Sequence, residues 1–200
     1  MDLQNYILNT DSYLKEFKQK NLYVRTYSLL DLALVKCKYD VDYDYESEPW
    51  IRYCRGVVIN TKTNKVICVP PIKSEEITDV NNITDNEENT YEVLIDGTMI
   101  NMFYHNEEWM ISTRSNIGGK NSWDGKVKFY ELFSEVSTNF EFKDELNKEH
   151  CYSFLLQHKK NRIVCPVTTN AITLVEEYDI NNLTRIKNLQ LKDIFIAPTM

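Results

Sequence analysis

Apolar residues recur at helical spacing at the start of the chain. Between residues 2 and 20 they fall close to helical spacing, at Leu3, Tyr6, Ile7, Tyr13, Leu14 and Phe17. This spacing predicts an amphipathic helix. The polar run Asn-Thr-Asp-Ser at 9–12 interrupts the pattern, and it favours two short helices as the alternative.

Short apolar segments rich in β-branched and aromatic residues predict strands along the rest of the chain. Those before residue 90 lie at 22–28, 32–39, 53–60 and 65–69, and those after it at 91–95, 98–104, 109–114, 152–157, 162–167 and 172–178. A weaker pattern at 193–197 suggests one more. The segments 53–60 and 65–69 form a predicted hairpin, and tight turns are expected at Asp96-Gly97 and at 105–108.

A second helical pattern runs from 122 to 136, with Ser122 as its expected N-cap. Its apolar positions are Val127, Phe129, Tyr130, Leu132, Phe133 and Val136. The polar stretch that follows, to residue 149, is also expected to be helical. The plan is α+β, with mainly antiparallel sheets and segregated helices. Two hundred residues suit a single domain spanning 1–200.

The net charge of −7 argues against non-specific binding to a polyanion, although it leaves room for a local cationic pocket. The five cysteines are odd in number and include no C-x-x-C pair, which is typical of buried free thiols in a reducing compartment. No apolar run approaches the roughly 18–20 residues that span a bilayer. The N-terminus also lacks the pattern of a signal peptide. We therefore expect a cytoplasmic protein without membrane contact.

Five ordered segments carry a resemblance to a known family. They are CRGVVI at 54–59, PPIK at 70–73, LIDGTMI at 94–100, STRSNI at 112–117, and FLLQH at 154–158 followed by NRIV at 161–164. In this order and spacing they resemble the RNA ligases of bacteriophage type, whose relatives are common in large DNA viruses. A lone Asp-Gly-Thr would be uninformative, but the ordered set is far more specific.

The resemblance implies a nucleotidyltransferase fold and ATP-dependent chemistry with Mg²⁺. In such ligases a lysine of a K-x-D-G motif attacks ATP, and the AMP passes to an RNA 5′-phosphate before a 3′-hydroxyl displaces it. On this chain the resemblance assigns nucleotide binding to five residues, with Asn161-Arg162 in a further family segment. The five are Arg55, Lys73, Asp96, Gly97 and Arg114.

The chain departs from the family pattern at the nucleophile. Leu94 stands where the family has its lysine, and an isobutyl group has no lone pair for attack. The segment Phe154–Leu156 lacks the acid that family members often carry. The family's later E/D-G and K-x-K segments do not occur before Met200.

Three hypotheses follow from these departures. The first is a catalytically degenerate ligase-like domain that retains nucleotide or RNA-end binding. The second is an active RNA ligase or adenylyltransferase that uses a partner chain or an unusual nucleophile, such as Lys73. The third is a non-enzymatic interaction protein. At residue level, Arg55, Lys73 and Arg114 could instead be surface charges or salt-bridge partners. The tyrosines of 39–45 could stack on nucleotides or only pack, and His158 is expected to be structural.

Overall fold

The computed structural model describes residues 2–74, 95–138, 141–161 and 166–186, and it confirms an α+β protein built on antiparallel sheets. The helices are α1 (Asp2–Leu8), α2 (Tyr13–Gln19) and α3 (Phe129–Val136), with 3-10 turns η1 (Ser28–Leu30), η2 (Pro49–Tyr53) and η4 (Glu141–Glu145). The strands are β1 (Tyr23–Tyr27), β2 (Leu32–Lys36), β3 (Arg55–Asn60), β4 (Lys65–Cys68), β5 (Thr98–His105), β6 (Glu108–Thr113), β7 (Asn116–Ile117), β8 (His150–Gln157), β9 (Ala171–Asp179) and β10 (Thr184–Arg185).

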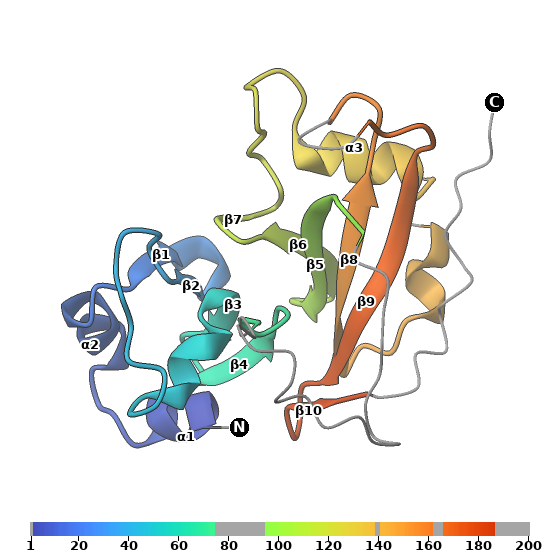
Figure 1. Ribbon diagram of the computed structural model, residues 1–200. Helices are drawn as coiled ribbons and strands as arrows, with labels where there is room; N and C mark the ends of the chain where they lie inside the picture. Colours follow the sequence, from blue (N-terminus) through green and yellow to red (C-terminus); the bar gives the residue numbers. More distant parts are fainter. Residues whose placement is uncertain (1, 75–94, 139–140, 162–165, 187–200) are drawn as a thin grey trace, which may run out of the picture.

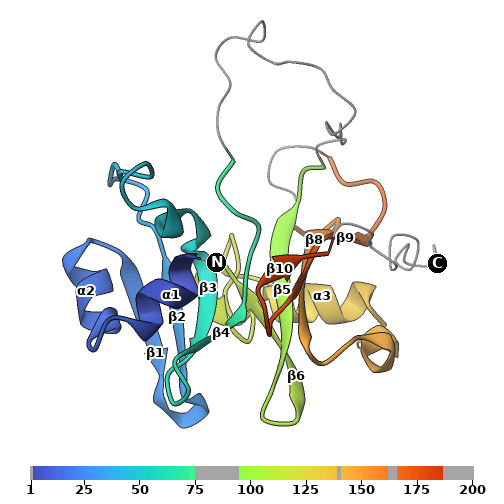
Figure 2. The same cartoon turned by 90° about the horizontal axis from the view of Figure 1, so that it is seen from below.

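The strands form two sheets. The N-terminal sheet has the order β1-β2-β3-β4, and the C-terminal sheet has the order β10-β9-β8-β5-β6-β7. Figure 2 shows the layers side by side, with α1 and α2 outside the N-terminal sheet and α3 beyond the C-terminal sheet. Figure 1 shows the same elements from the side, coloured along the chain.

Alternation along β5 divides the core in two, because successive side chains of a strand point to opposite faces of its sheet. Phe103 belongs to a cluster shared with the N-terminal sheet, α1 and α2. Its neighbour Met102 belongs to a second cluster with α3, which includes Phe133 and Phe154. The C-terminal sheet is therefore the central layer, with apolar packing on both faces.

Most predicted elements are confirmed. The opening helical pattern is two helices, interrupted at the polar run 9–12. The hairpin of β3 and β4 and the turn at 105–108 are present, and the latter places Asn106 and Glu107 at positive φ (48° and 66°). The predicted strands at 91–95 and 162–167 lie largely outside the described residues, and that at 193–197 lies entirely outside them.

The predicted helix at 122–136 is wrong in its first half, and Ser122 is not its N-cap. Helix α3 begins at Phe129, where the Glu131 carboxylate accepts a hydrogen bond from the Lys128 backbone N–H at 3.4 Å. Gly125 has a φ of +79°, which a right-handed helix does not allow. The polar stretch after α3 is also wrong as a long helix, because only the 3-10 turn η4 forms among its described residues. In the described part of the chain, no helix is long and apolar enough to cross a membrane.

Candidate functional site: a cationic cavity beside the N-terminal sheet

A cavity of about 380 Å³ lies where the N-terminal sheet meets the end of β6. We call it the cationic cavity, because five basic side chains and a single carboxylate are among the residues that line it: Lys38, Arg52, Arg55, Lys73, Arg114 and Asp42. Such a concentration of positive charge in a chain of net charge −7 is a local feature. It favours an anionic ligand.

The cavity gathers three of the five predicted nucleotide-binding residues. Arg55 begins β3, Lys73 follows β4, and Arg114 directly follows β6. The backbone N–H of Lys73 donates to the carbonyl of Arg52 at 3.1 Å, which fixes the segment after β4 against η2. Residues distant in sequence and drawn from both sheets therefore converge on one site.

Gly56 makes this convergence possible. It has a φ of +106°, and a Cβ built on it would lie 2.7 Å from the Cα of Arg114. Any side chain here would separate β3 from the end of β6, and the backbone angle also favours glycine. The Arg-Gly pair at 55–56 thus supplies one cation and the space that brings Arg114 close to it.

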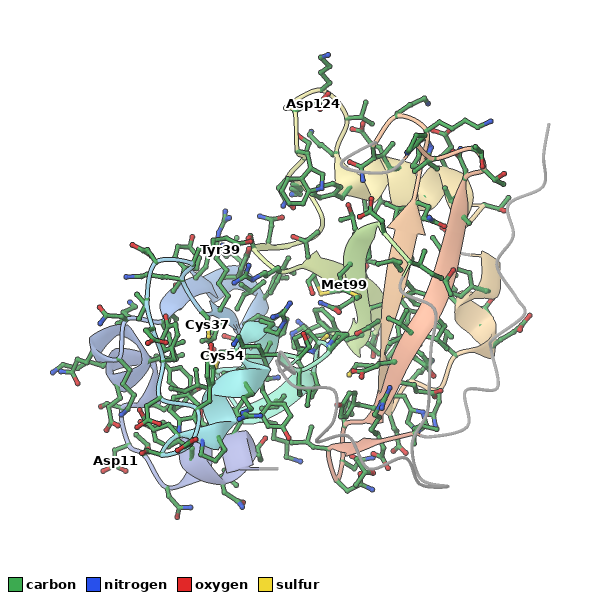
Figure 3. The ribbon with its side chains drawn as sticks, in the orientation of Figure 1. Asp11, Cys37, Tyr39, Cys54, Met99 and Asp124 are labelled. Atoms are coloured by element: carbon green, nitrogen blue, oxygen red, sulfur yellow. The ribbon has the colours of Figure 1, made fainter. Side chains whose placement is uncertain are left out.

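Tyrosine rings position two of the cations. The Nζ atom of Lys73 lies 4.6 Å from the centre of the Tyr45 ring, and the Cζ atom of Arg114 lies 4.1 Å from that of Tyr39. Arg114 also donates from Nη2 to the carbonyl of Cys37 at 3.0 Å. These contacts hold the positive groups over aromatic faces, an arrangement that stabilises cations without neutralising them. Figure 3 labels Cys37 and Tyr39 after β2, Cys54 before β3, and Met99 on β5.

Within the described residues, no carboxylate forms an ion pair with Arg55, Lys73 or Arg114. The salt-bridge alternative for these residues therefore has no support in this part of the chain. The Nε atom of Arg114 is buried and has no hydrogen-bond partner there. An anion in the cavity can accept hydrogen bonds from these three cations, which no described carboxylate neutralises.

The pKa of the Cys37 thiol is sensitive to the positive charges of the cavity. Burial raises its pKa, whereas a hydrogen bond with Tyr45 and the charges of Arg114, Arg55 and Lys73 act in the opposite direction. Burial likewise raises the pKa of Tyr45 to about 12. Both groups are uncharged at neutral pH, so the charge of the cavity is that of its five basic side chains and of Asp42.

Asp96 and Gly97 do not line the cavity; they precede β5 and contact β8. The Asp96 carbonyl accepts a hydrogen bond from Nε2 of Gln157 at 3.1 Å. A Cβ on Gly97 would lie 2.7 Å from the carbonyl oxygen of Leu156, so this glycine permits a close backbone approach. The Asp-Gly pair therefore lies at the start of β5, outside the lining of the cavity.

Two residues of the sequence prediction, Leu94 and Arg162, lie outside the described residues. The neighbouring Asn161 donates from Nδ2 to Oγ1 of Thr98 at 2.8 Å. His158 has a structural environment: its Nδ1 accepts from the Lys160 backbone N–H at 3.1 Å, and its Nε2 lies 3.4 Å from a Glu135 carboxylate oxygen. The segment Phe154–Leu156, where the family often has an acid, is buried apolar core.

Sequence reasoning missed several residues of the cavity. Lys38, Asp42 and Arg52 carried no motif, and the tyrosines of 39–45 were given only the roles of stacking or packing. The sequence offered one indication that this loop belongs to the site, because the loop begins at the end of a strand that lies next to Arg55. Of the acids interleaved with these tyrosines, Asp40, Asp42 and Asp44, only Asp42 lines the cavity.

Of the ATP and Mg²⁺ that the resemblance implies, ATP fits this site better than Mg²⁺ does. The cations suit the phosphates of ATP. The described residues hold no group of three or more His, Cys, Asp or Glu side chains that could bind a metal ion. Asp42 is the carboxylate that the cavity offers, so Mg²⁺ here would depend mainly on oxygens of the nucleotide phosphates.

A second, larger groove of about 480 Å³ lies over β6 and η4. The charged residues that line it are of both signs: Glu107, Glu108, Asp144, Lys143 and Lys148. Mixed charge gives no net attraction for a polyanion, so we place the candidate site in the smaller cavity.

Comparison with known proteins adds one viral relative. No protein family's sequence profile matches the chain. The chain is 27% identical over 171 residues to the immediate-early protein ICP-46 homolog of Invertebrate iridescent virus 3. The match covers 74% of this chain and 38% of that protein, so the chain spans well under half the length of this relative.

Proposed function

We propose that this chain is an RNA ligase-like nucleotidyltransferase domain that binds a nucleotide, or the phosphorylated end of an RNA, without capturing it covalently. The observation that carries the proposal is the convergence of Arg55, Lys73 and Arg114 in one cavity. These three residues come from three of the segments that resemble the ligase family. Residues selected by the resemblance alone thus form a spatial cluster.

The chemistry of the cavity suits phosphate groups. Guanidinium groups form bidentate, charge-assisted hydrogen bonds with phosphate oxygens, and an ammonium group adds a compact positive charge. The two tyrosine rings already contact cations. The cavity is therefore better suited to the phosphates than to the base of a nucleotide.

The absence of covalent capture follows from the residue at the nucleophile position. Leu94 cannot form a phosphoramide bond, because its side chain has no nucleophilic atom. One observation favours the second hypothesis, an active enzyme, because Lys73 brings an amine nitrogen into the cavity. The likeness to an iridescent virus protein supports a viral setting for either function.

The test uses ATP and GTP labelled at the α-phosphate, with Mg²⁺, on the native chain and on Leu94→Lys. We expect the native chain to retain label in native filtration and to lose it on denaturation in SDS. Label that stays on the native chain in a denaturing gel would contradict the proposal, and its loss in Lys73→Arg would identify Lys73 as the nucleophile. Absence of binding to either nucleotide and to a 5′-phosphorylated RNA would favour the interaction protein.

A further inference from the structure

Trp123 is a large aromatic side chain held in an exposed position. It is 64% exposed and lies in the loop between β7 and α3. Its indole N–H donates to Oγ1 of Thr98 at 3.1 Å, and its ring packs edge-on against Phe129, with centroids 6.1 Å apart and planes at 73°. Two contacts thus fix the side chain, while most of its surface remains accessible to solvent.

The loop that carries Trp123 is attached beside the cationic cavity. Oγ1 of Thr113 donates to Oδ1 of Asn121 at 3.1 Å, and Thr113 directly precedes Arg114 of the cavity. Thr98, the partner of the indole, directly follows Asp96-Gly97. Trp123 is therefore anchored to the start of β5, and its loop is tied to the end of β6 that leads into Arg114 of the cavity. Figure 1 shows this loop in yellow above β7.

The loop that carries Trp123 is rich in basic residues. The loop carries Lys120, Lys126 and Lys128 and a single acid, Asp124, which pairs with Lys126 at 3.8 Å. On the N-terminal sheet, Nζ of Lys36 donates to Oγ of Ser115, the residue after Arg114. Basic residues therefore outnumber acidic ones in this loop, and Lys36 adds a cation beside the residue that follows Arg114. This charge pattern suits a continuous phosphate backbone.

We propose that Trp123 is a stacking platform for a base of a single-stranded oligonucleotide whose terminal phosphate lies in the cationic cavity. The inference rests on the proposed function, because it takes the cavity as the phosphate site. The tyrosine rings of the cavity hold cations, whereas Trp123 offers an exposed indole to a base. Stacking of this kind tolerates any base. The site thus selects a polymer over a mononucleotide.

The test compares a fluorescently labelled, 5′-phosphorylated hexanucleotide with ATP and inorganic pyrophosphate, on the full chain and two variants. The variants are Trp123→Ala and Trp123→Phe, and the control is Tyr130→Ala, an exposed aromatic residue on α3. We expect Trp123→Ala to bind the hexanucleotide roughly 5- to 150-fold more weakly, the range for loss of one stacked base. Trp123→Phe retains most of the affinity, and Tyr130→Ala retains all of it. Binding of pyrophosphate is unchanged in all three.

The outcomes separate this inference from the proposed function. Equal hexanucleotide affinity in the native chain and Trp123→Ala would overturn the stacking role of Trp123. If the native chain still binds pyrophosphate in that case, the cationic cavity remains supported as a phosphate site. Failure of the native chain to bind pyrophosphate, ATP and the hexanucleotide would overturn both. RNA and DNA hexanucleotides should bind alike, because the ring stacks on the base. If Trp123→Ala does not fold, tryptophan fluorescence of the native chain replaces it. Quenching by the hexanucleotide but not by pyrophosphate would support stacking on Trp123, and absence of that difference would count against it.

Discussion

Gly56 of β3 lies against the backbone of Arg114 at the end of β6, so closely that a Cβ on Gly56 would lie 2.7 Å from the Arg114 Cα. The contact joins the two sheets at the edge of the cationic cavity. The position of Arg114 therefore depends on Gly56, a residue of the other sheet that has no side chain. Arg55, next to Gly56, and Arg114 thus share one cavity because β3 and β6 meet there.

Gly56→Ala is therefore expected to destabilise the protein and to disturb the cavity. The positive φ alone costs about 1–3 kcal/mol for a residue with a Cβ, and the clash with Arg114 adds to it. Gly125→Ala is the matched control, because Gly125 also has positive φ (+79°) but nothing within 4 Å of a built Cβ. Chemical denaturation should show a larger loss for Gly56→Ala. Equal losses would contradict the close contact.

Helix α3 is expected to depend on its buried face. Phe133 is fully buried and contacts the ring of Phe154, with centroids 5.8 Å apart. Phe133→Ala should lower the free energy of unfolding by about 3–5 kcal/mol, the usual cost of such a cavity. Tyr130→Ala, on the half-exposed face of the same helix, should cost less than about 1 kcal/mol. Similar losses at both positions in urea denaturation would show that α3 does not pack as described.

His158 is expected to make stability depend on pH. Burial lowers its pKa, against the raising effect of Glu135, so native His158 stays neutral where unfolded His158 takes up a proton. The unfolded state then binds more protons as the pH falls below about 6.5, and the native state loses stability. Protonation would also remove the acceptor for the Lys160 N–H. The melting temperature should fall less between about pH 7.5 and pH 5 in His158→Asn than in the native chain, and an unchanged slope would contradict this account.

Cys37 is expected to report ligand binding. The cations of the cavity lower the pKa of its thiol against the raising effect of burial, so an anion that neutralises them should raise that pKa. Pyrophosphate should therefore slow alkylation of Cys37 by iodoacetamide, since the thiolate is the reactive form. Peptide mass spectrometry can follow Cys37 separately from the fully buried Cys54 and Cys68. Equal alkylation rates at Cys37 with and without pyrophosphate would argue against anion binding at this cavity.

Periodicity was sufficient to predict most of the fold, because strands and helices with one buried face leave a clear apolar pattern. The pattern failed at 122–128, where Val127 continues the helical spacing of the residues in α3. Gly125 and the Trp123–Thr98 hydrogen bond instead hold this segment as a loop. Local spacing cannot reveal a tertiary contact with a strand more than twenty residues away in sequence.

The cations of the site could be predicted only through the family resemblance, since isolated Arg and Lys residues carry no pattern of their own. Arg55, Lys73 and Arg114 come together because of pairing between elements and the close approach at Gly56. The tyrosines that hold the cations could not be predicted, because the orientation of Tyr39 and Tyr45 depends on where Arg114 and Lys73 lie. The role of Gly97 could not be predicted either, because it depends on the close approach of its backbone to β8.

Calorimetric titration with ATP tests the central claim, a cavity that binds phosphate groups through converging cations, most directly. The titration compares the native chain with Arg55→Ala and Lys62→Ala. Lys62→Ala is the control, because Lys62 is an exposed cation in the β3–β4 turn, outside the cavity lining. We predict that the native chain and Lys62→Ala bind ATP equally, and that Arg55→Ala binds at least about tenfold more weakly, as loss of one charge-assisted hydrogen bond implies. Absence of binding by the native chain, or equal affinity in Arg55→Ala, would contradict the account.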